Sequence, residues 1–327
     1  MSRYLITGAA GFIAFHVASL LLDRGDEVVG VDNMNDAYDV RLKEWRLGQL
    51  TPRARFRFER LDVSDRGAVE SFFSTGRALG PVDGIVNLAA RAGIRESVRN
   101  PQAYVETNVT GTLNLLEACR KHGIQRFVLA SSSSVYGDSA RMPFREEDPL
   151  GRPLSPYAAT KRAAEDLCAS YAHVHGVRSA VLRYFTVYGP AGRPDMSPLR
   201  FVRWVVEGQP VRVFGDGRQS RNFTHVEDIA RGTVAALDRG QGWTFNLASR
   251  SPVRLLDFIA LVERAVGREA RVVFEAPSLA DVPETSADVS RAESVLGWSP
   301  AIGCEEGVRG LVTWYAENRE WAAALEH

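Results

Sequence analysis

Cysteine and long apolar runs are scarce in this chain of 327 residues. The three cysteines, Cys119, Cys168 and Cys304, are odd in number and far apart, which excludes a disulfide framework and favours a reducing compartment. No apolar run approaches the roughly 18 residues that a membrane-spanning helix needs, and no signal peptide precedes the first strand-like segment. We therefore expect a cytoplasmic protein.

Net charge is also lacking, because 40 basic residues balance 40 acidic ones. A neutral chain gives no electrostatic reason to expect nucleic acid or an anionic membrane as a partner. The six histidines form no cluster with metal-ligand spacing, so we predict no metal. What the chain does have is length and 45% hydrophobic residues, enough for a large core in one or two interleaved domains.

A glycine-rich turn between a strand and a helix opens the chain. Residues 3–7 read as a strand, Gly8 and Gly11 follow, and residues 13–24 have apolar side chains at helical spacing. A second strand ends at Asp32, which completes the dinucleotide-binding fingerprint. Gly8 permits the tight turn, Gly11 lets a pyrophosphate approach the helix end, and Asp32 accepts ribose hydroxyls. Since Asp32 would repel a 2′-phosphate, we predict NAD rather than NADP.

Strands and helices keep alternating after this unit, which predicts an α/β fold with a doubly wound parallel (Rossmann) sheet. Further strands are expected at residues 56–61, 84–88, 127–130 and 179–185, and a helix at 108–122. We expect the cofactor to contact residues at these strand ends and at the starts of the helices: Gly8, Gly11, Phe12, Ile13, Asp32, Asn33, Asp62, Val63, Leu88, Ala89, Ala90, Asn108, Tyr157, Lys161 and Tyr184.

Proline and glycine become frequent after residue 186, where we expect a smaller C-terminal α/β lobe for the substrate. Helix 226–237 and strand 243–247 are expected to return to the first domain. Ser251-Pro252 is a good cap and first turn for a helix at 253–266. The expected division is therefore 1–186 with 222–248 for the NAD-binding domain, and 187–221 with 249–327 for the substrate lobe.

The strand before Ser132 and the helix after Ser155 carry the residues best suited to chemistry. Tyr157 and Lys161 are four residues apart, so on a helix they lie on one face, one turn apart. A free tyrosine, with a pKa of about 10, is a poor base at pH 7, and we expect the Lys161 cation to lower that pKa. Tyr157 can then act as general base on a sugar or alcohol hydroxyl held by Ser132. YxxxK also occurs by chance, but Lys161 is one of only three lysines here.

Taken together, these motifs resemble one family. The segments are TGAAGFIA at the first turn, NLAA from residue 87, SSSSVYG from 131, SPYAATK from 155 and RNFTHVEDIA from 221. They are similar to those of the extended short-chain dehydrogenases that act on nucleotide sugars, over essentially the whole chain. Within that family, the acidic stretch at residues 31–43 most resembles the UDP-glucuronate 4-epimerases.

The resemblance implies an isomerase that converts UDP-glucuronic acid to UDP-galacturonic acid through a 4-keto intermediate, with NAD. It implies a homodimer and a catalytic triad of Ser132, Tyr157 and Lys161.

The same resemblance implies a set of substrate contacts. Arg221 is expected on the UDP diphosphate, Val213 and Phe214 beside uracil, and Asp281 on the uridine ribose. Arg91 departs from the pattern, since Gln or His is commoner there in the epimerases.

Two serines separate epimerisation from related reactions. Sugar 4,6-dehydratases carry Asp and Glu at the positions of Ser133 and Ser134, because elimination of water needs an acid and a base. UDP-glucuronate decarboxylases carry Glu at the position of Ser134. Both residues are neutral here, so the keto sugar is expected to turn over and take hydride back on its other face.

A glucuronate substrate brings a carboxylate that needs a partner. Arg193, which follows the active-site strand closely, is the expected clamp, with Thr186, Ser133 and Ser134 adding hydrogen bonds. Arg95 is a second candidate. Alternatively, Arg193 is a solvated loop cation in a chain rich in arginine.

Other functions remain open on the sequence. UDP-glucose 4-epimerase and UDP-glucuronate decarboxylase share the oxidation step. A non-catalytic NAD-binding sensor is also compatible, because a fold does not determine a function.

Overall fold

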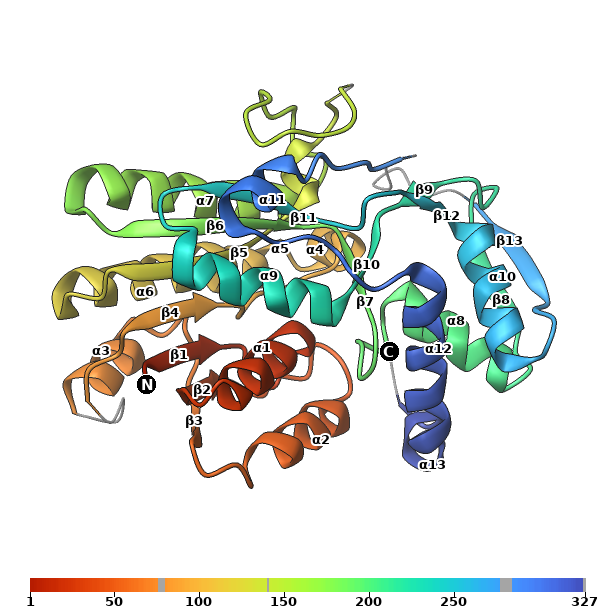
Figure 1. Ribbon diagram of the computed structural model, residues 1–327, viewed down its shortest axis with the longest axis horizontal. Coiled ribbons are helices and arrows are strands. Elements are labelled where there is room, and N and C mark those ends of the chain that lie inside the picture. Colours follow the sequence, from red (N-terminus) through yellow and green to blue (C-terminus); the bar gives the residue numbers. More distant parts are fainter. Residues whose placement is uncertain (76–79, 140, 277–283, 326–327) are drawn as a thin grey trace.

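The computed structural model describes residues 1–75, 80–139, 141–276 and 284–325. A seven-stranded, all-parallel sheet forms its centre, in the order β11-β6-β5-β4-β1-β2-β3 (Figure 1). This order, which extends from β1 in both directions, confirms the doubly wound sheet. The strands are β1 (Arg3–Thr7), β2 (Glu27–Asp32), β3 (Phe56–Arg60), β4 (Gly84–Asn87), β5 (Arg126–Ser132), β6 (Arg178–Tyr184) and β11 (Thr244–Leu247).

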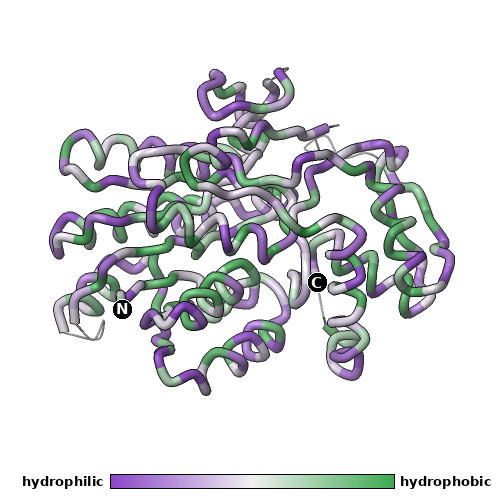
Figure 2. The backbone as a smooth tube through the Cα atoms, viewed as in Figure 1, coloured by the Kyte–Doolittle hydropathy of each residue, from purple (hydrophilic) through white to green (hydrophobic). Residues whose placement is uncertain are grey.

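Helices cover both faces of the sheet and bury its apolar side chains. One face packs against α1 (Phe12–Asp23), α9 (Val226–Arg239) and α11 (Ser290–Leu296). The other packs against α3 (Arg66–Ser74), α6 (Gly111–His122) and α7 (Pro156–His175). Figure 2 shows hydrophobic stretches along the central strands and the helices that flank them. Strands buried on both faces explain why the sequence reads there as short continuous apolar runs.

A smaller lobe with its own hydrophobic core forms beyond the sheet. Its helices are α8 (Ser197–Val206), α10 (Leu255–Val266), α12 (Cys304–Glu317) and α13 (Arg319–Ala322). Parallel strands β8 (Val211–Phe214) and β13 (Val272–Glu275) cover α8 and α10 (Figure 1). Two short pairs lie nearer the sheet: β7 (Thr186–Tyr188) with β10 (Phe223–His225), and β9 (Ser220–Arg221) with β12 (Val253–Arg254).

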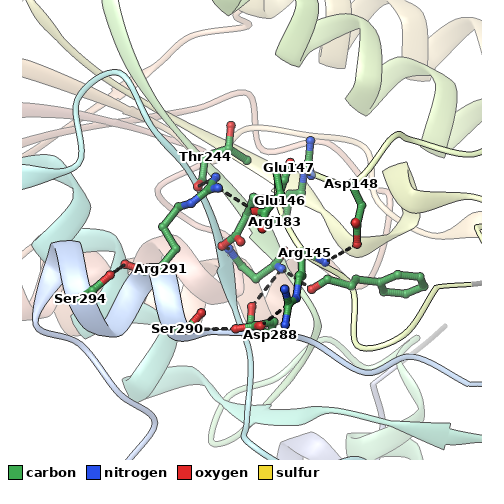
Figure 3. A network of polar contacts seen from close by, with 12 residues as sticks. Arg145, Glu146, Glu147, Asp148, Arg183, Thr244, Asp288, Ser290, Arg291 and Ser294 are labelled. Atoms are coloured by element: carbon green, nitrogen blue, oxygen red, sulfur yellow. Dashed lines mark hydrogen bonds and ion pairs between the residues drawn. The ribbon is translucent and has the colours of Figure 1, made fainter.

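The segment between β5 and α7 begins with the 3-10 helix η2 (Ser133–Tyr136) and is then tied to the segment before α11. Figure 3 shows the ion pairs that do this: Arg145 Nε lies 3.2 Å from Asp288, and Arg291 Nη2 lies 2.7 Å from Glu147. These contacts join two parts of the chain that are far apart in sequence.

The expected helix at 253–266 is wrong at its start. Val253 and Arg254 pair with β9 in an antiparallel arrangement, and α10 begins only at Leu255, with Arg254 as its N-cap. Ser251-Pro252 therefore precedes a strand. Pairing with a distant segment overrode a good local capping signal.

The helix expected from residue 108 begins earlier. Asn100 caps Pro101, its side chain accepting from the Ala103 N–H at 3.4 Å. From there α5 (Pro101–Tyr104), the π-helix η1 (Val105–Thr110) and α6 form one continuous helical run, preceded by α4 (Ile94–Arg99). Asn108 thus lies in a wide helical turn, a feature often found at functional sites.

In the part of the chain that is described, no helix is both long and apolar enough to cross a bilayer.

The fully buried Arg46, on α2 (Val40–Leu50), joins the first glycine-rich turn to the loop after β7. Its guanidinium donates to Ala10 O at 2.9 Å, to Ala191 O at 2.7 Å and to the Tyr38 hydroxyl at 2.8 Å. Burial lowers the pKa of Arg46, because the charge is far from water. Buried acceptors that lose their donor cost free energy.

We expect Arg46→Met to lower the free energy of unfolding by about 2–4 kcal/mol, because three buried acceptors lose their donor. Thermal unfolding followed by circular dichroism measures the change. Arg57→Met is the matched control, since Arg57 makes only a half-exposed pair with Glu59 at 2.7 Å and should change stability by about 1 kcal/mol or less. Equal effects of the two substitutions would contradict the structural role of Arg46.

Candidate active site

Ser132 is the last residue of β5, at the carboxyl edge where ligands bind in open parallel sheets. Its hydroxyl lies 3.2 Å from the Ser134 hydroxyl and accepts from the Ser134 N–H at 3.2 Å. Ser132 is buried, with 8% of its surface exposed, so few water molecules compete for its hydroxyl. The structure thus brings Ser132 and Ser134 together, and η2 places Ser133 beside them.

Helix α7 presents Tyr157 and Lys161 next to this strand end. Its start is well defined, because the Ser155 hydroxyl accepts from the Ala158 N–H at 3.1 Å and Pro156 occupies the first turn. The ring of Tyr157 packs edge-on against Tyr104 at a centroid distance of 6.1 Å. That contact restricts the ring, and the Ser132 side chain interacts with the Tyr157 phenol from the strand end.

Burial has the largest effect on the electrostatics of Tyr157. It raises the pKa of the phenol, and the Ser132 hydroxyl and the Arg193 guanidinium act in the opposite direction. The Lys161 ammonium donates to Ala130 O at 2.8 Å and keeps its charge, and the expected lowering of the Tyr157 pKa by Lys161 stays a prediction.

Lys161 itself is 5% exposed. Burial lowers the pKa of its ammonium to about 8, and the nearby Glu165 carboxylate opposes that change. A lysine with a pKa in this range can exist in either protonation state near neutral pH.

The first glycine turn fits a dinucleotide. Gly8 has φ +67°, and a Cβ there would lie 2.9 Å from Ala89 Cα, so only glycine fits between β1 and the end of β4. Gly11 is the N-cap of α1, and no side chain caps that end, where Phe12 and Ile13 form the first turn. An uncapped helix N-terminus after a glycine turn is where a pyrophosphate binds.

Acidic and amide groups gather at the ends of β2 and β3. Asp32 accepts from Ala10 N at 3.2 Å and from Met34 N at 2.8 Å, and its carboxylate lies 3.8 Å from Lys43 Nζ. Asn33 donates to Asp62 at 2.8 Å. Burial would raise the pKa of Asp62, but hydrogen bonds from Ser64 and Asn33 hold it below its usual value.

Asn108 ties the cofactor-side loop to the catalytic helix. Its amide oxygen accepts from Arg91 N at 2.8 Å, and its amide nitrogen donates to Arg91 O and to Thr160 Oγ1, both at 3.1 Å. With both amide hydrogens engaged by protein, Asn108 supports the site. The Nε of Arg91 is buried and has no hydrogen-bond partner.

Small residues line the end of β4, as expected. Leu88 N and Ala89 N both donate to Thr7 Oγ1, at 3.1 and 3.0 Å, which brings this backbone close to the glycine turn beside Ala90. Val63 is buried after β3, where its carbonyl accepts from Asn114 at 2.9 Å. The phenol of Tyr184 is buried on the α9 side, 2.9 Å from Thr233 Oγ1.

Arg193 lies close enough to Tyr157 to act on the pKa of its phenol. Its guanidinium forms a two-point pair with Asp195, at 3.0 Å from Nε and 2.7 Å from Nη2, and sits 5.0 Å from the centre of the Tyr38 ring. Burial acts to lower the pKa of Arg193, but Asp195 raises it overall. Arg193 is largely buried, with 16% of its side chain exposed, which excludes the solvated-loop alternative.

The other residues expected to contact the substrate come from α4, from β7 and from the lobe. The Arg95 guanidinium stacks 3.8 Å from the centre of the Phe214 ring, at the end of β8. Val213, the preceding residue of β8, is buried, and Arg221 lies in β9. The remaining two are Thr186, which opens β7, and Asp281, which lies outside the described residues.

Sequence reasoning missed several residues that shape this site. Thr7 joins β1 to β4, and Tyr104 supports Tyr157. Lys43 is buried beside Asp32, and as one of three lysines it carried a compositional signal. Asp195 had no such signal, because its role comes only from facing Arg193. Among the residues described, no group of His, Cys, Asp and Glu side chains has the arrangement of a metal site.

The chain belongs to the NAD-dependent epimerase/dehydratase family, whose model matches residues 4–248. This confirms the resemblance to the extended short-chain dehydrogenases. A UDP-glucuronate 4-epimerase of Thermodesulfobacterium geofontis (strain OPF15) is 46% identical over 327 residues, which is 100% of both chains.

Solved structures agree with this assignment. UDP-glucuronic acid 4-epimerase from Bacillus cereus, in complex with UDP-glucuronic acid and NAD, has a TM-score of 0.89 at 34% identity and covers 97% of this chain and 99% of its own. UDP-glucose 4-epimerase from Thermotoga maritima, with UDP-glucose, has a TM-score of 0.89 at 29% identity, with the same coverage.

We expect Asp32→Ala to weaken NAD binding at least about tenfold and to reduce the preference for NAD over NADP, because a charged hydrogen-bond acceptor for the ribose is lost. Titration calorimetry with each dinucleotide measures both effects. Asp36→Ala, at an exposed position of the same loop, is the control. An unchanged ratio of the two dissociation constants would show that Asp32 does not select the cofactor.

Proposed function

We propose that this protein is a UDP-glucuronate 4-epimerase, which interconverts UDP-glucuronic acid and UDP-galacturonic acid through a 4-keto sugar. The observation that carries the proposal is the convergence of Ser132, Tyr157 and Lys161 at one edge of a dinucleotide-binding sheet, with serines at positions 133 and 134. The 46% identity to a UDP-glucuronate 4-epimerase, over the full length of both chains, supports UDP-glucuronate as the substrate.

Ser132 and Tyr157 have different roles in the proposed reaction: one holds the sugar hydroxyl and the other accepts its proton. Bound NAD would supply a reversible hydride acceptor, held by the turn at Gly8 and Gly11 and by Asp32. Ser132 orients the C4 hydroxyl of the sugar, and Tyr157 takes its proton. Because burial raises the pKa of Tyr157, the phenol needs neighbouring positive charge to act as a base near pH 7. Arg193 provides part of that charge, and a nicotinamide cation would add to it.

Ser133 and Ser134 leave the keto sugar with no acid that could drive elimination. Their hydroxyls stay neutral and can only donate or accept hydrogen bonds. The 4-keto sugar can then rotate and take hydride on its opposite face, which inverts C4.

The substrate's carboxylate creates a hazard, because a 4-ketone beside it makes a β-keto acid that loses carbon dioxide readily. Arg193 is the cation best placed to hold the carboxylate out of alignment with the ketone. Asp195 holds the guanidinium through Nε and Nη2, and Nη1 is the group that would contact the substrate carboxylate. Thr186, at the start of β7 shortly before Arg193 in the sequence, would add a hydrogen bond to the carboxylate. Arg95 is the second candidate for the cation that holds it.

A further part of the proposal concerns assembly and location. We propose a homodimer, because the resemblance to the extended short-chain dehydrogenases implies one. We propose a cytoplasmic location, because all three cysteines are free thiols. We also propose that residues 1–186 and 222–248 bind NAD, and that 187–221 and 249–327 bind the UDP-sugar, including a ribose contact from Asp281. Neither nucleic acid nor a membrane is proposed as a partner, because the net charge is zero.

The direct test is incubation with UDP-glucuronate, followed by NMR of the products and absorbance at the NADH band. We expect UDP-galacturonate to form without net NADH. Tyr157→Phe should fold and bind NAD but lower kcat at least about 100-fold, since it loses the proton-transfer group. Tyr171→Phe is the control, because its hydroxyl lies on the same helix but bonds Glu117 at 2.7 Å.

Three outcomes would contradict the proposal. UDP-pentose as the main product would indicate a decarboxylase, and turnover of UDP-glucose alone would indicate a neutral-sugar epimerase. Binding of NAD with no turnover of any UDP-sugar would indicate a sensor.

Arg193→Leu should lower kcat/KM for UDP-glucuronate at least about 30-fold while leaving UDP-glucose binding nearly unchanged, since a buried charge partner is worth about 2–5 kcal/mol. The kcat/KM of Arg193→Lys for UDP-glucuronate should lie between those of the wild type and Arg193→Leu, because lysine keeps the charge but lacks the planar guanidinium. Arg218→Leu is the control for an exposed cation, with 84% of its side chain accessible. Parallel losses for both sugars would show that Arg193 acts through the fold alone.

A further inference from the structure

A buried ion pair lies directly behind the catalytic residues. Arg183, on β6, contacts both carboxylate oxygens of Glu165, on α7, at 3.1 Å from Nε and 2.8 Å from Nη2. Only 6% of the Arg183 side chain and 10% of the Glu165 side chain are exposed. Two desolvated charges at this depth need an explanation, because a buried pair seldom adds much to stability.

The same carboxylate also holds the strand that ends in the catalytic serine. The Ser131 hydroxyl donates to Glu165, and Ser131 is the register partner of Arg183 across β5 and β6. Lys161 donates to Ala130 O at 2.8 Å. Helix α7 is therefore fastened to β5 at two consecutive residues, through Lys161 and then through Glu165.

Glu165 stands one helical turn after Lys161, at the spacing that normally forms an ion pair. Among the residues described, no ion pair joins the two: Lys161 Nζ bonds Ala130 O, and both oxygens of Glu165 bond Arg183. The carboxylate stays close enough to stabilise the ammonium but does not capture it.

Arg183 is itself held in place from its other side. Its guanidinium lies 4.8 Å from the centre of the Tyr136 ring, and Nη1 donates to Glu146 O at 3.4 Å (Figure 3). The Tyr136 hydroxyl in turn donates to Asn246 at 2.7 Å. These contacts anchor Arg183 to β11 and to the segment after η2, so it cannot easily leave Glu165.

We propose that Glu165 and Arg183 are positioning residues for Lys161: Arg183 and Ser131 hold the Glu165 carboxylate on the sheet, so that it stabilises the Lys161 ammonium from one turn away without binding it. This proposal rests on the proposed function, in which Lys161 belongs to the catalytic set with Ser132 and Tyr157. It assigns a role to a buried pair that touches neither substrate nor cofactor.

The charge environment of Lys161 agrees with this arrangement. Burial lowers the pKa of Lys161, and Glu165 is the charged group that acts to raise it. Arg183 keeps a strongly raised pKa through Glu165 and stays charged. The other titratable or charged groups on α7 are Tyr157, Arg162, Asp166, Cys168, Tyr171, His173 and His175. Those on the elements packed against α7 are Arg95, Glu96, Arg99, Tyr104, Glu106, Glu117, Cys119, Arg120, Lys121, His122, Arg126, Tyr136, Arg178 and Tyr184.

The chain offers a direct measurement, because it contains only three lysines. Lysine labelled with ¹³C at Cε gives three NMR signals, which Lys43→Arg and Lys121→Arg assign by difference. The pH titration of the Lys161 signal, in the NAD-loaded enzyme without substrate, reports the charge of its ammonium independently of turnover.

Two single variants should move this midpoint in opposite directions. Glu165→Gln removes the negative charge and leaves Arg183 uncompensated, so the Lys161 midpoint should fall by roughly one pH unit. Arg183→Met releases Glu165 to pair with Lys161, so the midpoint should rise and kcat should fall at least about tenfold. The double variant removes both charges, so its midpoint should lie between those of the two single variants and below the wild-type value, because the stabilising carboxylate is gone.

Midpoints that stay unchanged in both single variants, or that move in the same direction, would overturn the proposal. If a single variant does not fold, Ser131→Ala decides: loss of one anchor of Glu165 should raise the midpoint slightly, and no change would count against the proposal. Wild-type turnover of UDP-glucuronate tests the proposed function separately, so the two can fail independently.

Discussion

The packing of α7 against the end of β5 is the interaction on which the rest of this structure depends. Ser132 comes from the strand, and Tyr157 and Lys161 come from the helix, so a shift of either element separates them. The Lys161 contact to Ala130 O holds the two elements in register. A proton can pass between a substrate hydroxyl and Tyr157 only while that register is kept, because proton transfer needs hydrogen-bond distance.

Buried positive charge is the second constraint on the site. Four of the largely buried cations are Lys161, Arg46, Arg183 and Arg193, and they are compensated in more than one way. Arg46 bonds only neutral acceptors, whereas Arg183 and Arg193 have carboxylate partners. A positive field in a poorly solvated site suits a phenol that must lose a proton and a substrate that carries a diphosphate and a carboxylate.

Local signals were reliable where one segment decides its own structure. Gly8 and Gly11 specify the first turn, and Ser155-Pro156 specifies the start of α7, because φ freedom and capping are short-range properties. The same kind of signal failed at Ser251-Pro252, where pairing with β9 produced a strand first. A capping signal of the same kind at Asn100-Pro101 was not used in the sequence prediction, and the helical run that carries Asn108 begins there, earlier than expected.

The sequence by itself determined the doubly wound sheet, the nucleotide fingerprint and the residue types of the catalytic set, because periodicity and spacing encode them directly. Only the tertiary structure decided how the charges act on one another. It showed that burial raises the pKa of Tyr157, that Lys161 bonds the strand and that Asp195 and Glu165 hold Arg193 and Arg183. The reason is physical: pKa values and ion pairs depend on desolvation and on distances between residues far apart in sequence, which no local pattern contains.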